Sequence, residues 1–161
     1  MKSVSVFIII LWLVFGVISS GTAGNTAVQR VTFRVLPINE ISVKGNPQEL
    51  IVRVAPSDSQ PKEIMDMNTT YAITTNGKKK ITGKIDTPMP TGTALKINLG
   101  APKGSIAAGD VPLTTNDADL VLGINKVAAP NLKITYKFSA LYQGGEVSGS
   151  RAVVLTLVDG N

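Results

Sequence analysis

The most constraining feature of this chain is a series of short runs in which apolar and polar residues alternate. In the first, Val31, Phe33 and Val35 alternate with Thr32 and Arg34. A period of two places every second side chain on one face of a β-strand, which suits a strand with one buried face. The same pattern recurs at residues 41–43, 50–54, 95–99, 132–140 and 153–157.

Gly, Pro, Asn and Asp separate these runs, and none of the runs has the spacing of an amphipathic helix. We therefore expect an all-β chain of eight to ten short strands. That number of strands predicts a single antiparallel β-sandwich of immunoglobulin-like or jelly-roll type. A barrel is the alternative architecture. The sequence has no repeat of fixed period, which argues against a solenoid or a propeller.

Two local signals refine this expectation. Asn76-Gly77 stands between two strand-like runs, and this dipeptide is typical of a type I′ hairpin turn, which needs positive φ at both central residues. Residues 57–68 are polar and rich in turn formers. There we expect a loop, with one helical turn at most over residues 62–67.

The N-terminus has the pattern of a secretory signal peptide. Lys2 precedes an apolar run over residues 6–18, and small or polar residues lead to Ala23. Such a run is shorter than the roughly 20 residues that cross a bilayer as a helix. We expect a cleaved signal peptide at 1–23 and one domain at 24–161, with a retained anchor as the alternative. The mature chain, expected to lack any transmembrane segment, would be secreted or displayed on the cell surface, with the periplasm as an alternative compartment.

The chain contains neither His nor Cys. Their absence excludes a Ser-His-Asp triad, a cysteine nucleophile and a zinc site built from these residues. Carboxylates such as Glu40 and Glu49 are scattered, and no pair of them is marked out for acid–base work. We expect a protein that is not an enzyme and that holds no cofactor.

Charged residues suggest few partners. Without Lys2 the chain has 15 Lys and Arg against 11 Asp and Glu, a mild excess that favours solubility. The run Lys78-Lys79-Lys80 is ordinary for a solvated strand end and is a candidate polyanion site as the alternative. Aromatic residues do not alternate with the basic ones, so we expect no nucleic-acid binding.

One loop concentrates acidic side chains. Asp117 and Asp119 stand beside Asn116, and Asp110 precedes them. Calcium takes six to eight oxygen ligands, and this loop offers about three side chains. Asn and Asp also favour turns through side-chain to backbone hydrogen bonds. We expect a turn, with calcium binding at Asp117 and Asp119 as the alternative.

Three segments, 71–77, 89–95 and 151–157, resemble secreted prokaryotic β-sandwich surface proteins, including spore-coat-U-like and pilin-type subunits. The resemblance implies an immunoglobulin-like fold and a role in surface filaments or coats, and it assigns no functional residue. Several of those families use a disulfide, whereas this chain has no cysteine.

A pilin-type role has a concrete physical form in this sequence. In donor-strand assembly an N-terminal strand completes the sheet of a neighbouring subunit, and its alternating side chains fill pockets there. Val31, Phe33 and Val35 would be the inserted residues in that case. We expect them to form the first strand of their own sandwich, with donation to a neighbour as the alternative. We expect a structural or adhesive surface protein whose partners are itself or other surface subunits. A small extracellular module that binds a ligand, a glycan or calcium is the competing function.

Overall fold

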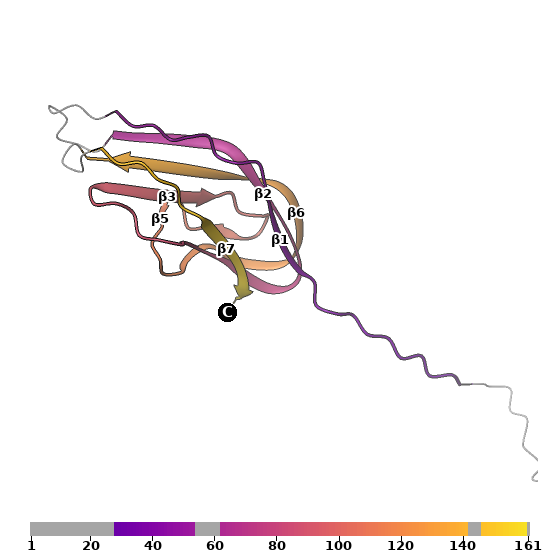
Figure 1. Cartoon of the computed structure of the whole chain (residues 1–161). Coiled ribbons are helices and arrows are strands. Elements are labelled where there is room, and N and C mark those ends of the chain that lie inside the picture. Colours follow the sequence, from indigo (N-terminus) through magenta and orange to yellow (C-terminus); the bar gives the residue numbers. More distant parts are fainter. Residues whose placement is uncertain (1–27, 54–61, 142–145, 161) are drawn as a thin grey trace, which may run out of the picture. The chain divides into compact units, whose positions relative to one another are not determined.

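The computed structural model describes residues 28–53, 62–141 and 146–160 (Figure 1). The chain divides into two compact units, residues 1–34 and 35–161. In the first unit, the described residues 28–34 form no strand or helix. The predicted signal peptide at 1–23 lies outside the described residues. Within the described ranges, no helix is long and apolar enough to cross a membrane.

The second unit is an open antiparallel sheet, which confirms the all-β prediction. The part of the chain that the structure describes contains seven strands and no helix. In space they follow the order β1-β2-β6-β3-β5, with β4 on β6 and β7 on β2. The strands are β1 (Asn39–Lys44), β2 (Lys62–Ile85), β3 (Thr93–Leu99), β4 (Ile106–Ala107), β5 (Val111–Pro112), β6 (Ala118–Ala140) and β7 (Val153–Asp159).

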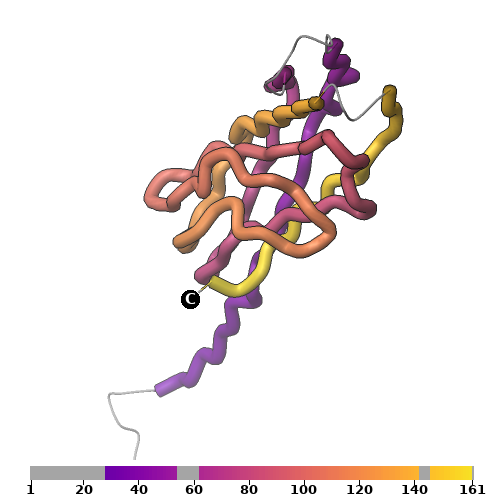
Figure 2. The backbone as a smooth tube through the Cα atoms, turned by 90° about the vertical axis from the view of Figure 1, so that its left-hand side faces the viewer, coloured from indigo at the N-terminus to yellow at the C-terminus, as the bar shows by residue number. Residues whose placement is uncertain are grey.

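Strands β2 and β6 dominate the sheet, with 24 and 23 residues. They pair antiparallel from Lys62 with Ala140 to Gly83 with Ala118, through several register shifts. The first half of β2 also pairs with β1, and its second half pairs with β7. Figures 1 and 2 show the two long strands curving together. The prediction of eight to ten short strands was wrong because runs expected to be separate are joined within these two.

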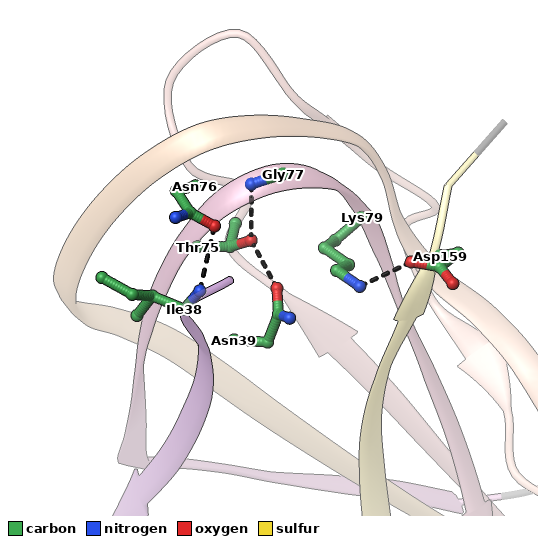
Figure 3. Close-up of polar contacts among 7 residues, drawn as sticks. All are labelled: Ile38, Asn39, Thr75, Asn76, Gly77, Lys79 and Asp159. Atoms are coloured by element: carbon green, nitrogen blue, oxygen red, sulfur yellow. Dashed lines mark hydrogen bonds and ion pairs between the residues drawn. The ribbon is translucent and has the colours of Figure 1, made fainter. Parts of the chain in front are cut away.

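The expected hairpin at Asn76-Gly77 is also wrong. β2 continues through both residues, and neither has the positive φ that a type I′ turn requires. Instead the ladder shifts register between Thr75 and Lys78. The Asn76 side chain bonds the main chain of Leu36 and Ile38, so it holds a neighbouring segment at a bend (Figure 3).

Two other segments differ from the sequence-based expectation. The run at 50–54 was expected to be a strand, but residues 50–53 form none, and Val54 lies outside the described residues. Residues 62–67 were expected to be a loop or a helical turn, yet they begin β2. There Lys62 and Ile64 pair with Ala140 and Phe138, so partner strands override a weak local preference. The strands expected at 95–99 and 153–157 are confirmed.

Both halves of the long strands contribute to one core. Ile73 and Tyr71 come from the first half of β2, and Ile81 and Ile85 from the second. Each is at most 1% exposed, and together they alternate with more exposed positions. The buried apolar residues form one cluster: Tyr71, Ile73, Ile81, Ile85, Ile97, Leu99, Leu113, Leu120, Val121, Ile124, Ile134 and Tyr136.

Candidate functional site

An apolar groove opens at the end of the sheet remote from the bend of β2. It encloses about 740 Å³. Its floor includes Leu95 from β3 and Tyr136 and Phe138 from β6. Two segments outside the strands, 47–52 and 146–151, form its walls, and Val153 at the start of β7 joins them. The alternation in β3 and β6 places these apolar side chains on one face of the sheet.

The groove walls have main-chain groups without partners. Residues 47–53 and 147–149 make no main-chain hydrogen bond to another described residue, whereas the Ser150 carbonyl oxygen accepts one from Arg151 Nη1 at 2.7 Å. By contrast, both main-chain groups of Ala152 are hydrogen-bonded to Asp86. The Asp86 N–H donates to the Ala152 carbonyl oxygen, and the Ala152 N–H donates to Asp86 Oδ1. Free main-chain groups beside an apolar trough are what an added strand requires.

The floor of the groove is a low-dielectric surface. Tyr136 is 7% exposed. Burial raises the pKa of its phenol, and the charge of Asp66 raises it further. A raised pKa keeps this phenol neutral over the physiological range. The floor therefore favours apolar groups.

Charge is confined to the rim. Glu49 and Glu146 line the groove and are exposed, and neither forms an ion pair with another described residue. Arg151 is engaged by carbonyl oxygens, because its Nε and Nη2 donate to Pro88 at 3.0 and 2.8 Å. Two carboxylates against one guanidinium give the described rim a small excess of negative charge, and both carboxylates lack an ion-pair partner among the described residues.

The predicted insert, Val31, Phe33 and Val35, is exposed. These side chains are 75%, 87% and 77% exposed, and residues 28–38 form no strand. The reading in which they form the first strand of their own sheet stays a prediction. Donation to a neighbour remains a prediction. In the second unit, Val35 lines a shallow hollow of about 510 Å³ together with Ile38 and Asn76.

The acidic loop brings its carboxylates to lysines. Asp119 lies 2.8 Å from Lys80 Nζ, and Asp117 lies 3.2 Å from Lys84 Nζ. Across the described ranges, no group of three acidic side chains could hold a metal ion. Asp117 and Asp119 are thus placed as ion-pair partners on the sheet surface, and calcium binding remains an untested prediction.

Asp110 lies apart from this pair of carboxylates. Its Oδ2 accepts a hydrogen bond from Lys137, and its Oδ1 accepts one from Asn98. These two bonds hold the pKa of Asp110 below its ordinary value, and the same carboxylate raises the pKa of Lys137. The geometry therefore supports a surface ion pair at this position.

The lysine run is divided among partners. Lys79 Nζ lies 2.5 Å from Asp159. Figure 3 marks this ion pair between β2 and the end of β7. Lys80 pairs with Asp119, while Lys78 is exposed. Two of the three lysines therefore form ion pairs between strands of the sheet. Their charges are already paired, which argues against a polyanion site here.

Sequence reasoning missed the groove itself. It assigned 50–54 to a strand and did not single out the second wall. The signal that was present is compositional: Pro47 begins the first wall, and Ser148, Gly149 and Ser150 lie in the second. Such residues weaken strand formation and leave backbone unpaired.

Comparison with known proteins adds no relative. No family model, curated protein or solved structure matches the chain significantly.

Proposed function

We propose that the protein is a secreted, non-enzymatic structural subunit of a cell-surface assembly, and that it assembles through its N-terminal segment. The exposed alternation of Val31, Phe33 and Val35 carries this proposal. Large apolar side chains on an extended segment gain free energy when they are buried by a partner, at roughly 25 cal/mol per Å². Self-association of identical subunits would bury them.

Two further features support this role. The apolar run at 6–18 has the character of an export signal. The lack of His and Cys throughout the sequence removes the commonest catalytic nucleophile and base systems. Export without such chemistry is what a coat, filament or adhesive subunit requires.

We also propose that the sheet folds over on itself as a β-sandwich of immunoglobulin-like type. β2 changes partners from β1 to β7 where it bends, and β6 has positive φ at Gly123 and Lys126 near the same bend. One core cluster draws on both halves of both strands. Facing halves with a shared core are the arrangement of a two-layer sandwich.

The decisive experiment compares the size in solution of a chain starting at Gly24 with one starting at Leu36. The shorter chain keeps Leu36 and Ile38, which Asn76 binds, so its sheet retains that contact. We expect concentration-dependent oligomers from the longer chain and a folded monomer from the shorter one. A longer chain that stays monomeric at the highest soluble concentration would exclude assembly through this segment.

The groove favours one competing function. Its volume of about 740 Å³ falls within the roughly 300–1,000 Å³ of small-molecule sites. A small extracellular ligand- or glycan-binding module is therefore the second candidate. A monomeric mature chain whose melting temperature rises with a soluble glycan or an apolar ligand would favour this function over assembly.

A further inference from the structure

We propose that the groove between residues 47–52 and 146–153 is the acceptor for the segment 28–36 of a second copy of this chain. In the complex, Val31, Phe33 and Val35 face the groove floor, and Arg30 and Arg34 face the acidic rim. This inference rests on the proposed assembly function and identifies its docking surface. It is argued from four properties of the described residues.

The first property is the match of apolar surfaces. In an extended strand, Val31, Phe33 and Val35 lie on one face, spaced by about 7 Å per pair of residues. The groove offers a floor of Leu95, Tyr136 and Phe138. These are apolar or aromatic groups that pack well against one phenyl ring between two branched aliphatic side chains.

The second property is the unpaired backbone on both sides. Residues 147–149 and 47–53 have main-chain groups without partners among the described residues. Among the described strands, only β2 pairs with β7, so the outer edge of β7 has no described partner either. A strand laid between these segments gains hydrogen bonds, as in other cases of strand addition.

The third property is charge. Arg30 and Arg34 alternate with the apolar residues, so they project to the opposite face of the segment. Glu49 and Glu146 are exposed at the rim and form no ion pair with another described residue. Long arginine side chains extend along a surface and reach such carboxylates.

The fourth property is reach, which selects a second copy over the same chain. β1 starts at Asn39, opposite Thr75 at the bend. An extended chain from Phe33 to Asn39 spans at most about 22 Å. The strand from Thr75 to Asp66, which pairs with Tyr136 of the groove floor, runs roughly 30 Å. The six residues from Phe33 to Asn39 are therefore too short a linker to cover this length of strand, which favours a second copy as the source of the segment.

Cysteine crosslinking tests the contact directly, because the natural chain has no cysteine. One protein carries Phe33→Cys, and a second carries Val147→Cys, at a groove residue that is 41% exposed. The two are mixed and oxidised. We expect a heterodimeric disulfide, which needs Cα atoms within about 7 Å. The matched control replaces Val147→Cys with Ile106→Cys, at an exposed position of β4, and we expect little crosslinking.

Charge reversal provides a second test that leaves the groove floor intact. Glu49→Lys with Glu146→Lys, or Arg30→Glu with Arg34→Glu, each sets like charges against each other. We expect the dissociation constant for assembly to rise about tenfold for either double variant alone. The effect is modest because the ion pairs at the rim are exposed to solvent. Mixing the two doubles restores the opposite charges, so we expect assembly to recover.

The outcomes separate this inference from the proposed function. Assembly that depends on residues 24–35 but shows equal crosslinking to Val147→Cys and Ile106→Cys would overturn the acceptor groove and leave the proposed function standing. A chain that neither assembles nor crosslinks would overturn both. Crosslinking only when both cysteines lie in one chain would show that the segment folds onto its own groove, which also overturns the inference.

Discussion

The main-chain N–H of Ile38 donates a hydrogen bond of 2.9 Å to the side-chain Oδ1 of Asn76 (Figure 3). The Nδ2 of the same side chain donates to the carbonyl oxygen of Leu36, also at 2.9 Å. Asn76 N–H donates to Ile38 O as well. One residue at the bend of β2 therefore fixes the main chain immediately before β1, where the exposed alternating segment ends.

We expect Asn76→Ala to lower the free energy of unfolding by about 1–2 kcal/mol, because two main-chain groups lose their partner. The loss should be local and should raise hydrogen exchange at residues 36–40. Asn125→Ala is the matched control, since Asn125 is exposed and has no hydrogen bond from its side chain to another described residue. Equal effects of the two variants in urea unfolding would contradict this role.

Two glycines of β2 are expected to respond differently to alanine. A Cβ at Gly83 would lie 2.5 Å from Leu120 Cδ1 and 3.3 Å from Leu155 Cδ2, within the core. Overpacking of this kind costs about 1–3 kcal/mol. A Cβ at Gly77 would meet nothing closer than 3.9 Å, and its φ is ordinary.

Thermal unfolding of Gly83→Ala and Gly77→Ala measures this difference. We expect a clear loss of stability for Gly83→Ala and little change for Gly77→Ala. A strong loss at Gly77 would instead indicate the type I′ hairpin that the sequence suggested, because that turn requires positive φ.

Stability should fall at alkaline pH through Tyr71. Burial raises the pKa of its phenol from 10 to about 12. Because the folded state holds the proton more tightly, the stabilisation is complete below pH 10 and is lost as the pH rises toward 12. Tyr136, whose pKa is also raised, acts in the same direction.

Tyr71→Phe separates this effect from the hydrogen bond of 2.6 Å that the phenol donates to Gly100 O. Near neutral pH we expect the variant to be less stable by about 1 kcal/mol. Above pH 10 the difference should shrink, because the variant lacks the titrating group. Urea unfolding across this range gives both values, and parallel pH curves for the two proteins would refute the assignment.

Calcium should not stabilise the protein. Asp117 and Asp119 already pair with Lys84 and Lys80, and exposed pairs of this kind contribute up to about 1 kcal/mol. We expect the melting temperature to stay constant when millimolar calcium is added or removed with a chelator. A rise that disappears in Asp117→Asn with Asp119→Asn would establish the calcium site and favour the binding-module function.

The all-β class followed from the period-two runs, because alternation reports directly on a strand with one buried face. Ile97 and Leu99 in β3 are buried and fall at alternating positions of the predicted run. Leu155 and Leu157 in β7 likewise alternate with more exposed residues. Patterning of this kind is local, so it is readable from the sequence.

Long-range pairing was not readable in the same way. The dipeptide Asn76-Gly77 is a strong local signal for a hairpin. In the structure, however, the Asn76 side chain binds the main chain of Leu36 and Ile38, which are far away in the sequence. Similarly, Lys62 and Ile64 are strand residues because Ala140 and Phe138 lie opposite them. The groove was missed for the same reason, since its walls come from two segments that only the tertiary fold brings together.

The pairing of β2 with β6 has a consequence for the time the chain needs to fold. Lys62 pairs with Ala140, and even the innermost rungs of this ladder join residues far apart in the chain. Loop closure must be completed before such pairs stabilise anything, so topologies of this kind fold in milliseconds to seconds. A newly made chain would therefore expose its apolar strand residues to solvent for longer than a helical domain of its size.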